Sequence, residues 1–297
     1  MKAESQLMAH EPGSPAPDHG PPAPAAPSEA EALTSPLLIG AGFVHAFFTR
    51  RGGVSQPPWD SLSFSLVQGD DPAAVLENRT RAARRLGVPE RALHYLSQVH
   101  GTEAQELRLG DDPDEVVRRV GDITLSATPH VACGVRSADC VPVLLGDRDT
   151  GSVAAVHSGW KGTLARVATT GVLRLRDLTC ARGDIVAAIG PCISACCFEV
   201  GDDVAAQLGL ASSAGDSALS WGPASGAAVA RTGSAAPTRR VDLRRIVRAQ
   251  LVEIGLSEAS IEDVPGCTFC DPVRFHSYRR DGERSGRLLS AIVARGA

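Results

Sequence analysis

The chain of 297 residues is long enough to bury a full hydrophobic core, as one large domain or two small ones. Its composition, 43% hydrophobic and 22% charged, is ordinary for a soluble globular protein. The net charge of −4 excludes an overall bias toward nucleic acid, and no run of about 18 apolar residues is present to span a membrane.

The chain has 8 cysteines, whose state depends on the redox compartment. The first residues, MKAESQLMAHEPG, contain no apolar segment of the kind found in secretory signals. A chain of this length also needs no disulfide bonds for stability. We therefore expect a cytoplasmic protein with reduced thiols, whose cysteines serve packing, catalysis or metal binding.

Residues 1–36 form a Pro/Ala-rich segment with almost no larger apolar side chains. Such a segment buries too little surface to offset the conformational entropy lost on ordering. We predict a disordered tail over residues 1–36 and a single catalytic domain over residues 37–297.

Three amphipathic helices are predicted in the domain. The first, within residues 70–89, begins at an acidic cap and ends at Gly87 and Pro89. The other two fall within residues 163–178 and 241–256. The apolar stripe of the first helix is formed by Val75, Leu76, Ala82, Ala83 and Leu86.

Short strands are predicted from apolar runs around residues 43–48, 131–136, 141–145, 152–157 and 184–190. Several follow one another without an intervening helix. This order argues against a simple alternating βαβ array and favours a mixed α/β or α+β sheet with layered helices. A small, polar, Gly-rich stretch around residues 210–240 lacks periodicity and is expected to be a flexible loop inserted into the domain.

Three side chains with metal-binding chemistry stand at the ends of predicted elements. Cys140 in SADCVPVLL precedes an apolar strand, and His157 ends the strand of AAVHSGWKG. His100 in SQVHG follows a short β-like stretch and precedes a glycine. Each has an ordinary interpretation as a buried or turn residue. Together, two imidazoles and one thiolate form a three-ligand set suited to zinc, with a fourth position open to water.

Two other interpretations of the cysteines stay open. In the first, Cys140 is a nucleophile, with His157 or His100 as base and Asp139 orienting it. In the second, other thiols bind a structural zinc, although the CxxxCC spacing of one group favours packing or thiols near the site. Those thiols are Cys192, Cys196, Cys197, Cys267 and Cys270.

Three basic residues are candidates for binding phosphate or another anion. Arg50 lies beside the Gly-Gly turn of TRRGGVS and directly after the apolar run FVHAFF, which keeps it near the core. Lys161 in HSGWKG stands at the start of a predicted helix, where the helix dipole favours anions. Arg279 comes from FHSYRRDGERSGR.

Nine sequence blocks occur in the order of one known family. They are FFTRRGGVS, GDDPAAVLENR, SQVHG, GDITLSA, RSADCVPVLL, AAVHSGWKGT, AAIGPCISACCFEVG, CTFCD and FHSYRRDGERSGR. Over residues 38–295 the chain resembles the laccase-domain purine nucleoside phosphorylases. This family was first described as multicopper polyphenol oxidases, and its members are also called peptidoglycan editing factors.

The resemblance implies a single-domain, layered α/β/β/α sandwich, similar to the cytotoxic-necrotizing-factor type of cysteine hydrolases. It implies one zinc ion bound by His100, Cys140 and His157, with copper as an alternative metal. It also implies phosphorolysis of adenosine, inosine, guanosine and methylthioadenosine, and deamination of adenosine. The expected partners are purine nucleosides and phosphate, and the expected state is a monomer or small homo-oligomer.

The chain departs from the usual pattern of this family at a few positions. Ser63 replaces an asparagine, Val67 and Gln68 replace a His-Val pair, and Lys161 replaces an arginine. Loss of the asparagine removes any substrate hydrogen bond that it would make. Lys161 keeps the positive charge but loses the bidentate geometry of a guanidinium group.

In a phosphorylase of this kind, Arg50 would position the phosphate, and the departing purine needs a proton near N7. Asp139 and Glu199 are the candidate acid or base groups, and Asp139 has an alternative role in orienting a metal ligand.

The main alternative function is a cysteine-dependent amidase that edits peptidoglycan precursors, with Cys140 as nucleophile. A copper-dependent polyphenol oxidase is a weaker alternative, because the 8 histidines include no His-X-His pair.

Overall fold

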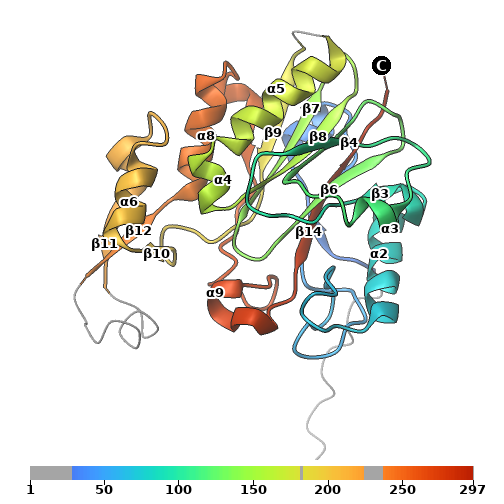
Figure 1. Ribbon diagram of the computed structural model, residues 1–297, viewed down its shortest axis with the longest axis horizontal. Coiled ribbons are helices and arrows are strands. Elements are labelled where there is room, and N and C mark those ends of the chain that lie inside the picture. The colour runs from blue at the N-terminus through green and yellow to red at the C-terminus, as the bar shows by residue number, and fades with distance from the viewer. Residues whose placement is uncertain (1–28, 181–182, 224–236, 297) are drawn as a thin grey trace, which may run out of the picture.

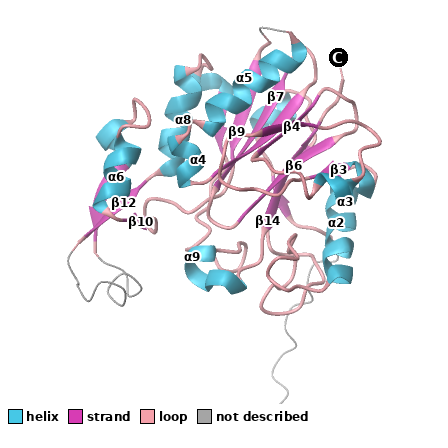
Figure 2. Cartoon of the chain, viewed as in Figure 1, coloured by secondary structure: helices cyan, strands magenta, loops and turns pink. Residues whose placement is uncertain are grey.

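The computed structural model describes residues 29–180, 183–223 and 237–296 (Figure 1). Two large β-sheets lie at the centre, with helices outside them and a small third sheet at one side (Figure 2). Within the described ranges, no helix has the length and apolar character needed to cross a membrane. Residues 1–28 of the predicted tail lie outside these ranges.

The six-stranded sheet contains most of the apolar runs seen in the sequence. Its spatial order is β13 (Ile261–Asp263), β9 (Ile185–Ile189), β7 (Val141–Asp147), β8 (Val153–Ser158), β5 (Ile123–Ser126) and β4 (Ala104–Glu106). The central strands β9, β7 and β8 pair antiparallel and are buried along their whole length. Because both faces of this sheet are covered, these strands appear in the sequence as continuous apolar runs.

The five-stranded sheet packs face to face on the six-stranded sheet. Its order is β1 (Ala32–Leu33), β2 (His45–Phe48), β14 (Leu288–Val293), β6 (Ala132–Ser137) and β3 (Leu93–His94). β14 lies in the middle, paired antiparallel with β2 on one side and β6 on the other. The core between the two sheets includes Phe47, Val135, Leu144, Ala155, Ala188 and Ile292.

Helices cover the outer face of each large sheet (Figure 1). α4 (Trp160–Leu164), α5 (Val167–Thr179) and α8 (Leu243–Glu253) pack on alternate residues of β7, β8 and β9. α2 (Pro72–Leu86) packs on the outer face of the five-stranded sheet. These packed faces confirm the expected α/β/β/α layering, while the likeness to cytotoxic-necrotizing-factor-type hydrolases stays a prediction.

Shorter helices connect these layers. The α-helices are α1 (Pro36–Gly40), α3 (Pro113–Val116), α6 (Asp202–Gly209) and α9 (Tyr278–Asp281). The 3-10 helices are η1 (Glu90–Ala92), η2 (Gly215–Ala218), η3 (Glu258–Ser260) and η4 (Gly282–Arg284).

α2 begins and ends where the sequence predicts. Asp71 caps its first turn, and Gly87 ends it with a φ of 70°, a conformation that favours glycine. The buried face differs from the predicted stripe, because Leu76 is 56% exposed. Asn78 and Arg79 are buried instead, and both donate hydrogen bonds to backbone carbonyl oxygens.

The helix predicted over residues 163–178 is divided into two helices. α4 ends at Leu164, and Arg166 adopts a φ of 59° before α5 begins at Val167. A residue in the left-handed region cannot continue a right-handed helix. The sequence pattern did not reveal this break because the apolar spacing continues from Leu164 to Val167.

The folded domain begins before residue 37, so that predicted boundary is wrong. Residues 29–36 include β1, in which Ala32 pairs with Phe48, and the start of α1. Ser35 is buried, and its backbone N–H donates to Nε2 of His45 at 2.7 Å. Backbone pairing orders this stretch despite its few apolar side chains.

The loop predicted over residues 210–240 is wrong in part. β10 (Glu199–Val200), β12 (Thr238–Val241) and β11 (Leu219–Gly222) form a small antiparallel sheet beside α6 (Figure 1). Main-chain hydrogen bonds order this polar stretch without an apolar period. Residues 224–236 of the predicted loop lie outside the described residues.

Candidate metal centre and substrate cleft

β5 and β8 bring a carboxylate and a histidine together at one end of the six-stranded sheet. Ile123 pairs with Val156, so Asp122 and His157 stand opposite each other at the next position along the two strands. Oδ1 of Asp122 lies 2.8 Å from Nδ1 of His157. The backbone N–H of His157 also donates to the carbonyl oxygen of Asp122 at 2.8 Å.

The same carboxylate fixes the loop that carries His100. Asp122 accepts hydrogen bonds from the backbone N–H groups of Val99, His100 and Gly101 at 3.2, 3.0 and 2.7 Å. The rings of His100 and His157 then lie with their centroids 4.9 Å apart. Asp122, which the sequence analysis did not single out, therefore positions both histidines.

Cys140 completes the trio from the residue before β7. One ligand atom each from His100, Cys140 and His157 lies within 4.8 Å of the others. Gly159 leaves room for them, since a Cβ there would lie 2.4 Å from Cδ2 of His100 and 3.1 Å from Sγ of Cys140. The structure thus brings together the three residues predicted as metal ligands.

Charge coupling within the trio favours a thiolate. Burial alone raises the pKa of Cys140, but the imidazoles of His157 and His100 reverse that effect and lower the pKa to about 6. Burial lowers the pKa of His157, whereas Cys140 and Asp122 raise it to about 9. Burial likewise raises the pKa of Asp122, but hydrogen bonds from His157 and the backbone bring it below its usual range.

An ionised Asp122 can only accept hydrogen bonds, so Nδ1 of His157 carries a proton. Nε2 is then the nitrogen of His157 that remains for the Cys140 thiolate or for a metal ion.

The donor set fits a transition metal ion. In a tetrahedral zinc site with Zn–N of about 2.0 Å and Zn–S of about 2.3 Å, neighbouring ligand atoms lie about 3.5 Å apart. Sγ of Cys140 and Nε2 of His100 are 3.7 Å apart. Histidines that bind a metal through one ring nitrogen commonly donate a hydrogen bond to a carboxylate from the other, as Nδ1 of His157 does to Asp122. These residues can hold zinc, and two imidazoles with one thiolate are also a donor set for copper.

A cleft of about 580 Å³ opens beside the trio. Its volume lies within the range of small-molecule sites, about 300–1,000 Å³. The aromatic side chains of Trp160, Phe198 and Tyr278 line the cleft, together with Gln68 from the segment before α2. Flat apolar faces beside polar groups suit a heteroaromatic ligand.

Besides Arg279, two other arginines line the cleft, Arg136 on β6 and Arg287 before β14. Burial lowers the pKa of both, and the positive charge of Arg287 lowers that of Arg136 further. Each donates to backbone carbonyl oxygens, Arg136 at 3.1 and 2.9 Å and Arg287 at 2.7 and 3.0 Å. Among the described residues, neither forms an ion pair with a carboxylate. Partly buried positive charge of this kind suits an anionic ligand.

Sequence reasoning missed both arginines. Arg136 interrupts the apolar run VACGV before SADC, and a charged residue inside a buried strand is the signal that would have found it.

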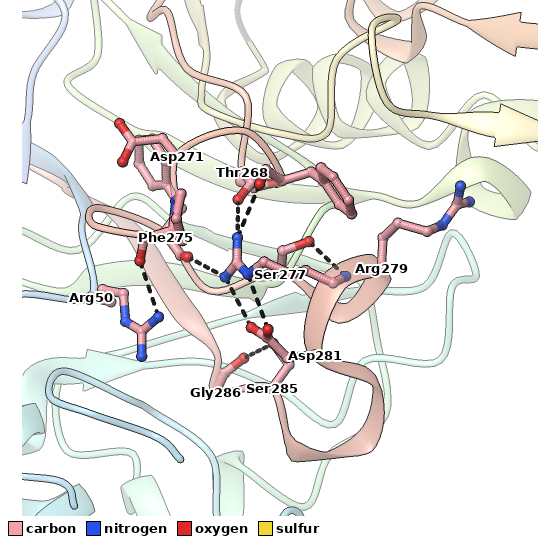
Figure 3. Close-up of polar contacts among 12 residues, drawn as sticks. Arg50, Thr268, Asp271, Phe275, Ser277, Arg279, Asp281, Ser285 and Gly286 are labelled. Carbon is pink, nitrogen blue, oxygen red and sulfur yellow. Dashed lines mark hydrogen bonds and ion pairs between the residues drawn. The ribbon is translucent and has the colours of Figure 1, made fainter. Parts of the chain in front are cut away.

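Arg50, predicted to bind phosphate, lies outside the cleft. Its Nε donates to the carbonyl oxygen of Asp60 at 2.7 Å, and its Nη1 donates to that of Pro272 at 3.1 Å. Its Nη2 lies 3.2 Å from the carboxylate of Asp60. Figure 3 shows Arg50 and Arg279 on opposite sides of the segment that carries Phe275 and Ser277. Arg50 therefore links protein segments and does not line the cleft, and its binding of phosphate stays a prediction.

The other predicted site residues lie at different places relative to the cleft. Lys161 is exposed, with Nζ 5.7 Å from the ring centroid of Trp160, and does not line the cleft. Glu199 lines a neighbouring hollow of about 530 Å³, where its carboxylate lies 3.2 Å from Nη2 of Arg240. Arg279 lines both the cleft and this hollow.

Asp139 lines the cleft, but its bonds support the wall rather than the trio. Its Oδ1 accepts from Oγ1 of Thr268 at 2.6 Å, and its Oδ2 accepts from the backbone N–H of Arg279 at 2.6 Å. The carboxylate that contacts His157 in the structure is that of Asp122, at 2.8 Å.

Comparison with known proteins gives a family match over most of the chain. The family described as multi-copper polyphenol oxidoreductase laccase matches residues 44–295. A relative named purine nucleoside phosphorylase, from Mycobacterium tuberculosis, is 37% identical over 82% of this chain and 89% of its own length. Another of that name, from Pseudomonas aeruginosa, is 38% identical over 82% and 90%.

Solved structures share the fold. YlmD from Geobacillus stearothermophilus aligns with a TM-score of 0.76 and 31% identity, over 88% of this chain and 94% of that one. The hypothetical protein YfiH of Bacillus licheniformis aligns with a TM-score of 0.76 and 28% identity, over 86% and 93%. The mixed α/β fold predicted from the sequence is confirmed.

Proposed function

Because the chain belongs to the multi-copper polyphenol oxidoreductase laccase family and its similar relatives are named purine nucleoside phosphorylases, we propose that it is a purine nucleoside phosphorylase. The observation that carries the proposal is a single cleft that combines a candidate metal-binding trio, aromatic walls and the guanidinium groups of Arg136 and Arg287. Aromatic walls suit the base of a nucleoside, and guanidinium groups suit a phosphate ion. The substrates proposed are adenosine, inosine, guanosine and methylthioadenosine.

The purine base stacks on the aromatic side of the cleft, against Phe198 and Tyr278. Gln68 supports this placement, because its Oε1 is buried and has no hydrogen-bond partner among the described residues. A ring N–H or amino group of a purine would satisfy that oxygen. The residue that departs from the usual family pattern is thus proposed to contact the base.

The phosphate binds to Arg136 and Arg287, which take the role first assigned to Arg50. An anion there compensates the positive charge of both groups, which burial otherwise disfavours.

In phosphorolysis, a phosphate oxygen forms a bond to C1′ of the ribose while the bond from C1′ to N9 breaks. The electron pair leaves with the purine, which takes up a proton. Asp139 accepts two hydrogen bonds as a carboxylate, so we assign it to positioning the cleft wall. Glu199 is ion-paired in the neighbouring hollow and is not assigned a step.

His100, Cys140 and His157 would hold zinc, with copper as the alternative for the same donors. When bound, zinc supplies Lewis-acid stabilisation and lowers the pKa of a bound water. The same cleft is proposed to accept deamination of adenosine, in which an oxygen from water replaces the 6-amino group and ammonia leaves. The free thiols of the chain fit a reducing, cytoplasmic location.

The test is release of hypoxanthine from inosine, measured with and without phosphate on the full chain. We expect phosphate-dependent release that falls at least about a hundredfold in His157→Ala, since loss of a ligand removes the metal. Arg287→Ala should raise the KM for phosphate about tenfold, because a charge-assisted hydrogen bond is lost.

The matched control is Arg174→Ala, an exposed arginine on α5, which should leave the rate unchanged. No release of base from any purine nucleoside at high enzyme concentration would rule the function out.

One observation favours a second candidate, a cysteine-dependent amidase acting on peptidoglycan precursors. Cys140, His157 and Asp122 are arranged as nucleophile, base and orienting carboxylate. This function requires that zinc-free protein reacts rapidly with iodoacetamide at Cys140 and hydrolyses muropeptide amides. Protection of Cys140 by zinc, together with active phosphorolysis, would exclude it.

A further inference from the structure

A second cluster of thiols lies outside the trio. It is formed by Cys196 and Cys197, which follow β9, and by Cys267 and Cys270, which follow β13. All four Sγ atoms lie within 4.8 Å of one another. Cys196 is 3.5 Å from Cys197, 3.7 Å from Cys267 and 3.6 Å from Cys270, and Cys197 is 3.2 Å from Cys270.

We propose that these four cysteines bind one structural zinc ion as a tetrathiolate. With Zn–S bonds of about 2.3 Å, the edges of a tetrahedral site are about 3.8 Å long. The observed sulfur–sulfur distances of 3.2–3.7 Å are close to that length. A disulfide would require about 2.05 Å, and all four thiols are free.

Burial in a hydrophobic core does not explain this cluster. Cys196 and Cys270 are exposed, and Cys197 and Cys267 are only half-buried. By contrast, Cys133 and Cys192 are fully buried and lie outside the cluster, as packing cysteines do. A group of thiols that is neither bonded nor buried is accounted for by a shared ligand.

Two backbone contacts connect the segments that carry the cluster. The segments that carry the cysteines pair through a parallel bridge between Cys192 and Cys267. The backbone N–H of Ser194 donates to Sγ of Cys267 at 3.5 Å, a contact that stabilises a thiolate. The two segments therefore already hold the sulfur atoms toward a common centre.

Two arginines contact the segments of the cluster, and one of them, Arg280, is ion-paired with Asp281 at 2.9 Å. A zinc ion with four thiolates carries a net charge of −2, from four negative charges and two positive ones. Nη1 of Arg279 donates to the carbonyl oxygen of Cys197 at 3.4 Å. Nη1 of Arg280 donates to the carbonyl oxygens of Thr268 and Phe269 at 2.9 and 3.2 Å. Both guanidinium groups thus contact carbonyl oxygens of the segments that carry the cysteines.

A zinc ion at this position would connect two segments that line the cleft. Ile193 and Phe198 flank the pair Cys196 and Cys197 in the sequence. Tyr278 and Arg279 follow the pair Cys267 and Cys270. All four of these flanking residues line the cleft. Asp139 is bonded to both segments, since its carbonyl oxygen accepts from the N–H of Ile193 at 2.9 Å and its carboxylate accepts from Arg279. The second zinc would therefore hold the cleft in shape without touching the substrate.

The test uses metal analysis of the full chain, purified without a polyhistidine tag in reductant. In a Cys140→Ser/His157→Ala background, which disables the trio, we expect about one zinc ion per chain. X-ray absorption at the zinc edge should show four sulfur ligands at about 2.3 Å, and this measurement leaves the cluster itself unchanged. Adding Cys270→Ala should remove the ion, whereas Cys180→Ala, at an exposed cysteine outside the cluster, should retain it.

Two results would overturn the proposal: a metal-free protein in that background with all its cysteines reactive toward thiol reagents, or a disulfide between any two of the four. Neither result depends on phosphorolysis. The test therefore fails or succeeds separately from the proposed function.

Discussion

Asp122 accepts hydrogen bonds from the side chain of His157 and from the backbone N–H of His100. One carboxylate therefore positions two of the three residues in the trio. As long as it is ionised, Nδ1 of His157 is the protonated nitrogen. A neutral amide at this position would keep the size of the side chain but would lose two of its acceptor sites.

We predict that Asp122→Asn weakens zinc binding at the trio about 10–100-fold, the usual cost of losing an outer contact of a metal ligand. Phosphorolysis should fall with it. A competitive chelator titration measures the affinity, and Asp114→Asn, an exposed residue in α3, is the matched control. An unchanged affinity would show that Asp122 does not position the trio.

At the scale of elements, α2 supports the cleft through one buried residue. Oδ1 of Asn78 accepts from the N–H of Val54 at 2.9 Å, and its Nδ2 donates to Oγ of Ser55 at 2.8 Å and to the carbonyl oxygen of Ser63 at 2.9 Å. The segment held in this way continues to Gln68, which lines the cleft. The helix is thus connected to the cleft through hydrogen bonds of the Asn78 side chain.

We predict that Asn78→Ala lowers the free energy of unfolding by about 2–3 kcal/mol, because it leaves buried polar groups without partners. It should also raise the KM for nucleoside, since Gln68 is displaced. Urea unfolding and steady-state kinetics measure the two effects. Leu76→Ala on the same helix is exposed and should change neither.

Which strands could be predicted from the sequence depended on a recognisable apolar run and not on burial alone, since β5 is buried at every position. β7 and β8 were predicted because strands covered on both faces need an apolar residue at nearly every position. β5, with the sequence ITLS, was missed because it is short and half polar. β11 and β12 were missed because main-chain pairing, rather than an apolar period, orders them.

The candidate site was also predicted only in part from the sequence. His100, Cys140 and His157 were predicted from residue type and family resemblance. Asp122 was not, because its role depends on its register with β8, which no local pattern contains. That Arg50 does not line the cleft could not be predicted, because its position after an apolar strand does not determine the direction of its side chain.

At the scale of the whole molecule, His276 makes stability depend on pH. It is 1% exposed, and burial, followed by the positive charges of Arg50, Arg280 and Arg287, lowers its pKa to about 3. The unfolded chain has a pKa near 6.5 at this residue. The unfolded state therefore binds the proton first, and stability present above about pH 6.5 is lost as the pH falls toward about 3.

We predict that between about pH 7 and pH 5 the wild type loses about 2 kcal/mol more unfolding free energy than His276→Gln, which cannot take up the proton. Denaturant unfolding at the two pH values measures this difference. Equal losses in both proteins would mean that His276 is protonated in the folded state as readily as in the unfolded chain.

The central position of β14 has a consequence for the order of events in synthesis. β2 and β6 are synthesised before β14. They do not pair with each other, because residues 288–293 of β14 lie between them in the sheet. The five-stranded sheet therefore stays divided on the ribosome until nearly all of the described chain has emerged. Since Arg287 and Tyr278 arrive with that last segment, the cleft of a nascent chain stays incomplete until then.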